Sequence, residues 1–283
     1  MQRISIASVR QTFRLEKAAR VRRIALLAVC GSAFCTGLVA HAVTMGTASG
    51  YALISGTATT STGATKITGD VGYGTAFTRG DAVVNGVIHA INDADTIKAR
   101  DDARSAYTTI AALDYTENLT GQDLGGGRVL TPGVYFFSSS ALLTGKLTLD
   151  GRGQTNPEFI FQIGSTLTTD SSYSEIYAFN GAVDWNVFFQ VGSSATLGTG
   201  TKFIGTILAE TSITLNTGAT VNGGLFAHTG AVTLDSNTIG AVPEPASAAL
   251  VVAGLALIAT FRKRCKPKTA VDAASPRVSL TEL

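Results

Sequence analysis

Short runs of Thr, Leu and Asp recur along the middle of the chain, and they are the first residues whose spacing could carry chemistry. Their last position holds Asp150, Asp170, Asn216 or Asp235, and carboxylate or amide oxygens repeated along a surface could bind calcium. Gly198 takes the same position in one repeat and has no side-chain ligand to offer. Asp, Asn and Gly also tolerate turn geometry. We therefore predict corner residues here, and no metal site.

The remaining polar residues do not form the pattern of an active site. We expect His89 and His228 to be isolated packing or solvated histidines, with no acidic or cysteine neighbours at metal-ligand spacing. A polysaccharide lyase or hydrolase would need clustered carboxylates, whereas the acidic residues here are scattered. The sequence contains no nucleophile elbow or phosphate-binding loop. It predicts neither an enzyme nor a bound cofactor.

The composition indicates a packed, turn-rich β protein. Of 283 residues, 15% are charged, 45% are hydrophobic and 31 are Gly. Between Val43 and Val242, nine Lys and Arg stand against sixteen Asp and Glu, a net charge of −7, which makes nucleic acid a poor partner. Cys30, Cys35 and Cys265 lie outside this region, so we expect no disulfide or thiolate metal site within it.

The N-terminal end has the layout of an export signal. Arg20, Arg22 and Arg23 precede an apolar run that ends in the small-residue cleavage site Ala40-His41-Ala42. This order is typical of a secretory signal peptide, here residues 1–42. An N-terminal membrane anchor is the alternative. A lipoprotein site at Cys30 is less favoured, because the residue before it, Val, occupies a position that prefers a smaller side chain.

The C-terminal end has the layout of a second targeting signal, at residues 242–266. Pro243-Glu244-Pro245 is followed by an apolar run from Ala246 to Phe261 and by a basic end from Arg262 to Lys266. This layout resembles the PEP-CTERM sorting signal of Gram-negative bacteria. The resemblance implies a transpeptidase-like membrane protein that recognises the Pro-Glu-Pro, removes the transient membrane anchor, and passes the protein to the cell surface or an exopolysaccharide matrix.

One feature of this end departs from the sorting signal. A polar tail, residues 267–283, follows the basic end and is longer than usual. A simple C-terminal membrane anchor is the alternative, although the apolar run is short for a stable span. Either version places residues 43–241 outside the cytoplasm.

The middle of the chain is a repeat. Its column of related triplets follows at offsets of 20, 28, 18 and 19 and comprises Thr148-Leu149-Asp150, Thr168-Thr169-Asp170, Thr196-Leu197-Gly198, Thr214-Leu215-Asn216 and Thr233-Leu234-Asp235. A period of 18–20 with β-branched residues in short runs is typical of one solenoid coil. We expect the flanking Thr to point outward and the apolar residue of the run to point inward, namely Leu149, Leu197, Leu215 and Leu234. The longer offset leaves room for a loop at Asn180 to Asp184.

One segment breaks the β pattern. From Asn92 to Leu113 there is no Gly or Pro, and apolar residues recur at steps of three and four, namely Ala99, Ala103, Ala106, Ile110 and Leu113. Asn92, Asp93 and Asp95 suit a helix start. The sequence thus predicts a β-solenoid with one narrow-faced helix packed alongside.

Five segments carry a resemblance to a known family. They begin at Tyr51, Leu130, Pro157, Asn186 and Ser212, and together they span residues 51–239 in order. They resemble the microbial ice-binding domain (DUF3494 type). The resemblance implies an all-β solenoid, specifically a discontinuous right-handed β-helix of triangular section with a long helix along one side.

Function is also implied by this resemblance. Members bind ice through one flat, relatively hydrophobic surface, and some carry Thr-(Ala/Gly)-x-(Thr/Asn) patterns there. Thr62 to Thr65 and Thr217 to Thr220 match, whereas the equivalent Thr199-Gly200-Thr201-Lys202 ends in a Lys that would interrupt a flat surface. The expected ice-binding residues are Thr62, Thr65, Ser171, Thr199, Thr201, Thr217 and Thr220.

A different class of binder remains open. Outward threonines also occur in β-solenoids that never meet ice, because Thr is a good strand residue. The protein could instead be a structural or adhesive component of the cell surface or exopolysaccharide matrix. A sugar-binding surface would usually expose aromatic side chains, and Tyr173 is the single aromatic residue near the Thr column.

Overall fold

The computed structural model describes residues 43–90, 92–170, 173–183 and 186–240. The predicted signal peptide, the sorting signal with Pro243, Glu244 and Pro245, the polar tail and Ser171 lie outside the described residues. Among the described residues no helix is both long enough and apolar enough to cross a membrane.

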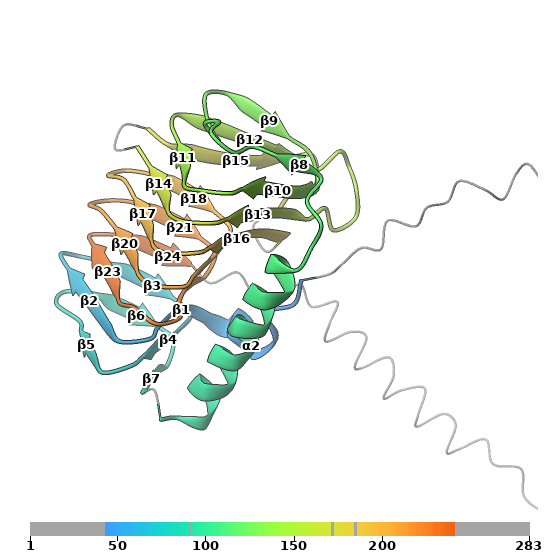
Figure 1. Ribbon diagram of the computed structural model, residues 1–283. Helices are drawn as coiled ribbons and strands as arrows, with labels where there is room; N and C mark the ends of the chain where they lie inside the picture. The colour runs from blue at the N-terminus through green and yellow to red at the C-terminus, as the bar shows by residue number, and fades with distance from the viewer. Residues whose placement is uncertain (1–42, 91, 171–172, 184–185, 241–283) are drawn as a thin grey trace, which may run out of the picture. The chain divides into compact units, whose positions relative to one another are not determined.

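The described strands form three parallel sheets (Figure 1). Sheet A, in spatial order, contains β7 (Ile88–Ala90), β4 (Asp70–Tyr73), β1 (Tyr51–Ser55), β22 (Leu225–Ala227), β19 (Thr206–Ala209), β16 (Val187–Val191), β13 (Phe159–Ile163), β10 (Gly133–Phe137) and β8 (Glu117–Asn118). Sheet B contains β11 (Ala141–Leu143), β14 (Leu167–Thr169), β17 (Ala195–Leu197), β20 (Ile213–Leu215), β23 (Val232–Asp235), β2 (Ala58–Thr62) and β5 (Ala76–Thr78). Sheet C contains β6 (Val83–Asn85), β3 (Lys66–Thr68), β24 (Thr238–Gly240), β21 (Thr220–Asn222), β18 (Lys202–Ile204), β15 (Glu175–Phe179), β12 (Lys146–Asp150) and β9 (Arg128–Leu130).

The coils are stacked out of sequence order. Consecutive strands pass from sheet A to B to C, so that one coil runs from β10 to β12 and the next from β13 to β15. The last coil, β22 to β24, pairs in parallel with the first coil, β1 to β3. The chain therefore starts in the middle of the stack, builds one end, crosses to the other end and returns. The strand order of the three parallel sheets therefore confirms the predicted solenoid and its discontinuous order of coils.

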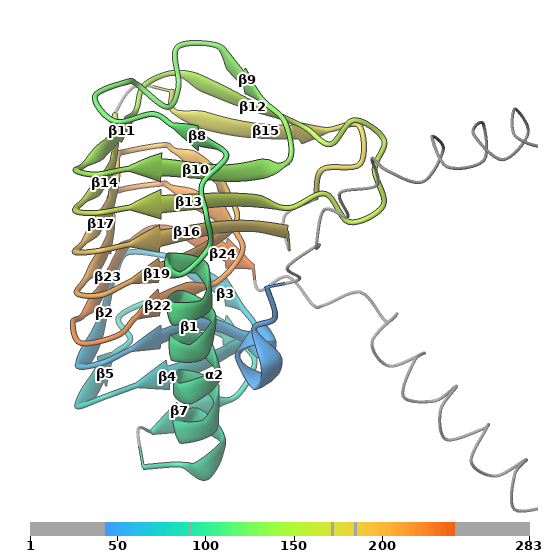
Figure 2. The same ribbon diagram turned by 45° about the vertical axis from the view of Figure 1, so that its right-hand side comes forward.

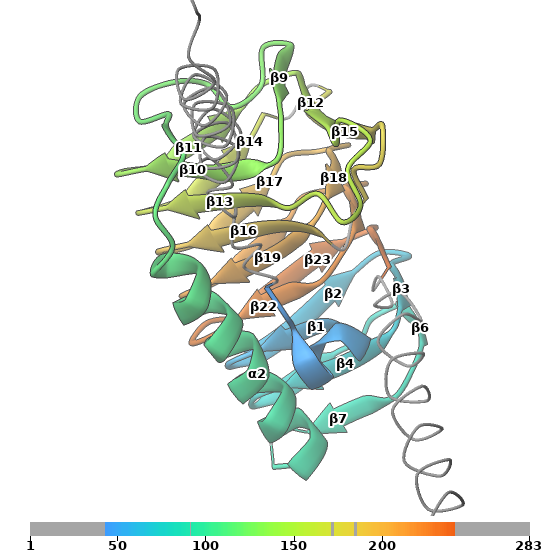
Figure 3. The ribbon, with the colours of Figure 1, turned by 90° about the vertical axis from the view of Figure 1, so that its right-hand side faces the viewer.

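The crossing segment is the predicted helix, α2 (Ala94–Ala111), which is two residues shorter at each end than the sequence pattern suggested. It runs along the outside of sheet A (Figures 2 and 3). Its buried residues include Ala99, Ala103, Ala106 and Ile110, as predicted. They pack on outward apolar side chains of sheet A, which are Ile54, Ile160, Phe188, Leu208 and Phe226. A short 3-10 helix, η1 (Gly46–Gly50), contacts the same helix.

Small alanines bring the helix close to the sheet, and one buried amide fixes its end. The Nε2 atom of Gln162 on β13 donates hydrogen bonds to the carbonyl oxygens of Ile110 (2.7 Å) and Leu113 (2.8 Å). The Ile110 carbonyl also accepts from the backbone N–H of Leu113 at 3.1 Å, so the Gln162 amide adds a second bond to it and one to the Leu113 carbonyl beyond the end of the helix. Sheet A is consequently covered, whereas no helix packs on sheets B and C among the described residues.

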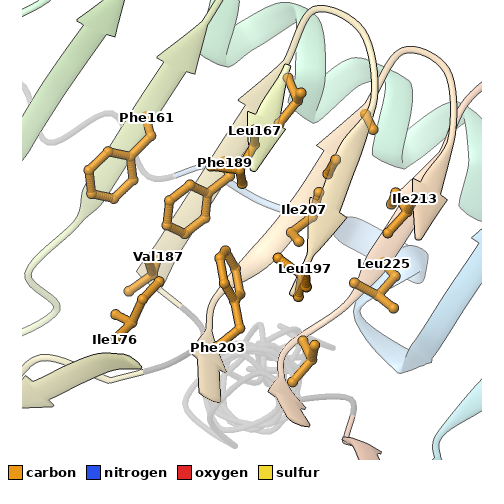
Figure 4. Packing of buried hydrophobic residues seen from close by; sticks show 14 of the residues in the cluster. Phe161, Leu167, Ile176, Val187, Phe189, Leu197, Phe203, Ile207, Ile213 and Leu225 are labelled. Atoms are coloured by element: carbon orange, nitrogen blue, oxygen red, sulfur yellow. The ribbon is translucent and has the colours of Figure 1, made fainter. Parts of the chain in front are cut away.

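The core fills the space between the three sheets with inward side chains stacked coil on coil. Phe161 and Phe189 are stacked with ring centroids 4.4 Å apart, and Phe203 lies 4.7 Å from Phe189 (Figure 4). Leu197, Leu215 and Leu234 form another inward column, as predicted from the repeat. The parallel register holds each side chain above its equivalent, so burial is shared between neighbouring coils.

Gly205 is required at the corner between β18 and β19. Its φ is +119°, and a Cβ atom there would lie 2.8 Å from the carbonyl oxygen of Val187. We expect Gly205→Ala to lower the free energy of unfolding by about 3 kcal/mol, because it combines a disallowed backbone with a clash against a neighbouring coil. Denaturant unfolding monitored by circular dichroism measures this.

Gly218 provides the matched control for that prediction. Its φ is also positive, +74°, but a Cβ atom there would meet nothing within 4 Å. Gly218→Ala should therefore lower the free energy of unfolding by only about 1 kcal/mol, because the left-handed backbone conformation is its single source of strain. Equal losses in the two variants would show that the close approach at Gly205 is not what stabilises this corner.

Candidate functional site

The outward side of sheet B carries one continuous column of threonines. Strand pairing places in register Thr168, Thr196, Thr214, Thr233, Thr60 and Thr78, which we call the threonine column. Leu142, 45% exposed, continues it at one end. Neighbouring strands of a sheet lie about 4.8 Å apart, so the column repeats one hydroxyl and one methyl group at that spacing.

The hydroxyl groups of the threonine column are free for solvent. Among the described residues, none of the six donates or accepts a side-chain hydrogen bond within the protein, and none of the six is buried. Thr side chains in strands are restricted at χ1 by β-branching. The column is therefore a rigid row of groups whose hydrogen bonds are left to water.

A second outward column lies two residues before the first. It contains the small residues Ser140, Thr166, Ser194, Ser212, Ala231, Ala58 and Ala76. Its hydroxyls bond along the stack: Thr166 Oγ1 lies 2.8 Å from Ser140 Oγ, and Ser212 Oγ accepts from the backbone N–H of Ala231 at 3.2 Å. Neither column contains a charged residue, so the surface is narrow, flat and uncharged.

The other sides of the stack differ in character. Sheet A is covered by α2. The outward positions of sheet C place Lys146, Glu175, Lys202 and Lys66 in one column with Thr220 and Thr238. Charged side chains of this length hold water strongly and do not form a level surface. Sheet B is thus the open, uncharged side among the described residues.

A hydrogen-bonded carboxylate fixes the end of sheet B nearest Leu142. Asp123 forms a parallel bridge with Leu142, and its carboxylate accepts from the N–H of Gly125 (2.7 Å), the N–H of Thr144 (3.1 Å) and the Thr144 hydroxyl. Burial raises the pKa of Asp123, but the bonds from Thr144 and Gly125 and the charge of Arg128 outweigh this and lower it below the ordinary value.

This carboxylate should make stability depend on acid pH. A pKa that is lower in the folded state stabilises the fold above the unfolded value of about 3.9, and the contribution is lost as pH falls through the folded pKa. We expect Asp123→Asn to cost about 1–2 kcal/mol at pH 7 and progressively less below about pH 4. Denaturant unfolding of both proteins at several pH values tests this, and a difference independent of pH would contradict it.

The described residues among the predicted site lie where sheet B turns into sheet C, and of them Thr62, the last residue of β2, belongs to a sheet B strand. Gly63, Gly200 and Gly218 have positive φ there, so the Thr-Gly-x-Thr pattern describes a left-handed turn. Thr62, Thr199 and Thr217 are exposed at this corner, and Thr220 begins β21 on sheet C.

Two of those residues cannot reach a ligand, which corrects the expectation for them. Thr65 and Thr201 are completely buried, because each directly precedes a sheet C strand, at a position that points into the stack. Thr201 Oγ1 lies 2.6 Å from Thr169 Oγ1, and Thr65 Oγ1 accepts from the N–H of Asn237. Three of the other predicted residues donate their hydroxyl hydrogens to groups within the protein. Thr62 donates to the carbonyl of Leu234, Thr217 to the carboxylate of Asp235, and Thr220 to the carbonyl of Thr201.

The structure corrects three further expectations. Thr148, Leu149 and Asp150 belong to sheet C, and Leu142 takes the place assigned to Thr148 in the column. Lys202 is on sheet C and does not interrupt the threonine column. His89 is not isolated, because its Nδ1 atom lies 2.8 Å from the Asp93 carboxylate.

Two of the predicted corner residues, Asp235 and Asp150, accept hydrogen bonds within the protein. Asp235 accepts from the hydroxyls of Thr217 and Ser236, and Asp150 accepts from the N–H of Arg152 and the side-chain amide of Asn180. These bonds fit the predicted role as corner residues.

Thr60 and Thr78 are the site residues that sequence inspection missed, since no repeat spacing connects them to the column. The column itself was visible as Thr168, Thr196, Thr214 and Thr233. The sequence predicts that the first Thr of each of these triplets points outward, and the structure confirms this.

The chain is similar to known proteins over the whole solenoid. Residues 53–240 match the family described as Ice-binding-like. An ice-binding protein of Nostoc sp. (strain HG1) is 47% identical over 259 residues, covering 85% of this chain and 95% of that protein. An ice-binding protein of Colwellia sp. is 32% identical over 244 residues, covering 79% of this chain and 94% of its own.

Solved structures agree with this similarity. The crystal structure of an ice-binding protein from the Antarctic ascomycete Antarctomyces psychrotrophicus matches with a TM-score of 0.68 and 40% identity, covering 71% of this chain and 99% of that one. With the family model matching most of the described solenoid, the chain belongs to the ice-binding-like family.

Proposed function

We propose that this protein binds ice through the outward side of sheet B. The observation that carries the proposal is the threonine column, whose hydroxyls form no hydrogen bond among the described residues and whose neighbours are uncharged. Its relatives of similar length, including the one from Nostoc sp., are ice-binding proteins.

The proposed mechanism depends on the regular spacing of the threonine side chains and involves no catalysis. Methyl groups of the column favour ordered water around them, while the hydroxyls hydrogen-bond into that layer. The rigid rotamers mean that little conformational entropy is lost on docking. Many weak contacts repeated along one row add up to very slow release, and growth of ice between bound molecules is then restrained by the curvature of the front.

The predicted corner residues Thr62, Thr199 and Thr217 form the rim of the proposed surface. They lie at the boundary of sheets B and C, next to the ends of β2, β17 and β20. We propose that they order water beside the column without forming its central contacts, because the Thr62 and Thr217 hydroxyls are already bonded within the protein.

Partition into growing ice tests the proposal. The fluorescently labelled protein is cooled with a slowly growing ice hemisphere, and its concentration in the ice is compared with that of an unrelated protein of similar size. Enrichment in the ice is expected. Exclusion equal to that of the unrelated protein would overturn the proposal.

We propose the following for the rest of the molecule. The coils wind as a right-handed β-helix of triangular section, with one sheet per side. Residues 1–42 direct export and are removed. Pro243, Glu244 and Pro245 lead a sorting signal for a transpeptidase-like membrane protein, so the product reaches the surface or surroundings of a Gram-negative cell.

An adhesive role in an exopolysaccharide matrix is a second candidate. It is favoured by exposed aromatic side chains on sheet C: Tyr177 is 46% and Phe179 is 40% exposed, and their rings lie 6.1 Å apart. Aromatic rings exposed on a sheet can stack on sugar rings. Sheet C would then hold the matrix while sheet B binds ice, so a variant that abolishes one kind of binding should leave the other intact.

A further inference from the structure

A compact polar cluster lies where the last strand of sheet A leads into α2. His89 on β7 stands between two carboxylates: its Nδ1 atom is 2.8 Å from Asp93 Oδ2, and its Nε2 atom is 3.8 Å from Asp70 Oδ2. One side-chain oxygen of Asp95, in the first turn of α2, lies within 4.8 Å of the ligand atoms of His89 and Asp93. Three segments at one end of the stack thus bring one imidazole and three carboxylates together.

Two buried hydroxyl groups at this cluster lack partners. Tyr51 is 5% exposed and Thr96 is fully buried, and among the described groups neither Tyr51 Oη nor Thr96 Oγ1 has a hydrogen-bond partner. The Tyr51 ring lies against the His89 ring, with centroids 5.5 Å apart. The Thr96 hydroxyl is near enough to the Tyr51 hydroxyl to lower its pKa by hydrogen bonding, and each hydroxyl, which can both donate and accept, keeps capacity for a further partner.

The charges of the carboxylates act on the Tyr51 hydroxyl. Burial raises its pKa, the neighbouring Thr96 hydroxyl lowers it, and the charges of all three aspartates raise it. These hydroxyls therefore belong to the same small region as His89 and the acidic side chains.

The negative charge of this region is not balanced by basic side chains. Among the residues that the structure describes, no Lys or Arg forms an ion pair with Asp70, Asp93 or Asp95. Lys98, one turn further along α2, pairs with Asp102 instead. A cation would remove the mutual repulsion of the three carboxylates.

We propose that His89, Asp93 and Asp95 bind a divalent transition-metal cation, with Zn²⁺ the preferred ion. Two ligand atoms bound to one such ion at about 2.1 Å lie roughly 3.0–3.4 Å apart, close to the spacing of His89 Nδ1 and Asp93 Oδ2. A mixed set of imidazole nitrogen and carboxylate oxygen suits Zn²⁺, whereas Ca²⁺ takes oxygen ligands.

Asp70 completes the arrangement as a positioning residue. It lies 3.8 Å from the opposite ring nitrogen, Nε2, and a carboxylate that closes this gap to hydrogen-bond distance orients a metal-bound histidine and fixes its tautomer. Asp70 is itself held by the N–H of Val87, which donates to Oδ1 at 2.7 Å.

The ion would fasten one end of the stack. His89 is on the last strand of sheet A, Asp70 begins the preceding strand and Asp93 precedes the helix. One bound ion would join these segments and resist fraying at β7, which has a neighbour on one edge alone among the described strands.

Isothermal titration of the chelator-treated full chain with ZnCl₂ tests the proposal. We expect one Zn²⁺ per chain at this site, no comparable binding of CaCl₂, and a rise in Tm of about 5–10 °C at 100-fold excess over Kd. Asp95→Asn and Asp93→Asn should each weaken binding by about tenfold or more. Asp101→Asn, an exposed aspartate of the same helix, should bind as the parent does.

The variants separate the possible results. Because Asp95 is exposed, Asp95→Asn should fold normally, and its circular dichroism and metal-free Tm check this. Absence of Zn²⁺ binding by the parent would overturn the proposal. Binding that is unchanged in both Asp93→Asn and Asp95→Asn would equally overturn it, since the ion would then be held by other residues.

Discussion

Replacing Thr214 by Tyr should remove most of the ice-growth inhibition of this protein. Thr214 is in the middle of the threonine column, between Thr196 and Thr233, and its outward position is fixed by pairing on both sides. A phenol ring there would stand above the surface and hold the neighbouring coils away from the ice lattice. A residue at the centre of a contact surface commonly contributes about 2 kcal/mol, so the protein concentration needed for a given effect should rise at least about tenfold.

Thr238→Tyr is the matched control for that variant. Thr238 is also an outward, exposed strand threonine, but it lies on sheet C in the coil next to that of Thr214. It should leave ice-growth inhibition unchanged. Both variants should keep the parent Tm, because neither side chain fills the core.

The pair of variants also distinguishes the two possible surfaces. Activity that survives in Thr214→Tyr but is lost in Thr220→Tyr or Thr238→Tyr would move the ice-binding surface to sheet C. Loss in Thr217→Tyr alone would move it to the corner between sheets B and C.

Phe189→Ala should be among the most destabilising single substitutions in the solenoid. The ring is fully buried and stacks between Phe161 and Phe203. Truncation leaves a cavity that the parallel coils cannot close, because each backbone is held by its neighbours on both sides. We expect the free energy of unfolding to fall by about 3–5 kcal/mol.

Phe179→Ala provides the comparison for this effect. Phe179 is 40% exposed at the end of β15, so its removal should change stability by less than about 1 kcal/mol. Urea unfolding of the three proteins measures the difference. A loss in Phe189→Ala no larger than that in Phe179→Ala would contradict the packing described for the core.

The repeat and the helix could be predicted because both depend on local patterns. The step of three and four from Ala99 to Ile110 needs no tertiary information, and the structure buries those residues against sheet A. Likewise the outward threonines from Thr168 to Thr233 follow from alternation in short strands.

The assignment of coils could not be completed from the sequence. Thr148 fits the Thr-Leu-Asp pattern, yet it is on sheet C, because strands of two sheets share the same alternation. Thr60 and Thr78 join the column only because the first coil pairs with the last one, far away in the chain. No periodicity in the sequence records that contact.

The corner threonines show a different limit. The Thr-Gly-x-Thr pattern at Thr62 and Thr217 predicts ligand-binding residues, and the structure shows that its Gly adopts the left-handed turn that ends a strand. Alternation stops at a turn, so sequence alone does not tell that Thr65 and Thr201 point inward. His89 and Asp93 also meet through a strand-to-helix junction that no metal-ligand spacing describes.

Growth of single ice crystals in a solution of the unmodified protein tests the central claim most directly. Crystals are held just below the melting point in a nanolitre osmometer while the temperature is lowered slowly. We predict faceted crystals that stop growing over a measurable gap before they burst. Round crystals that grow freely at high protein concentration would contradict ice binding, and the solenoid would then be a matrix or adhesion module.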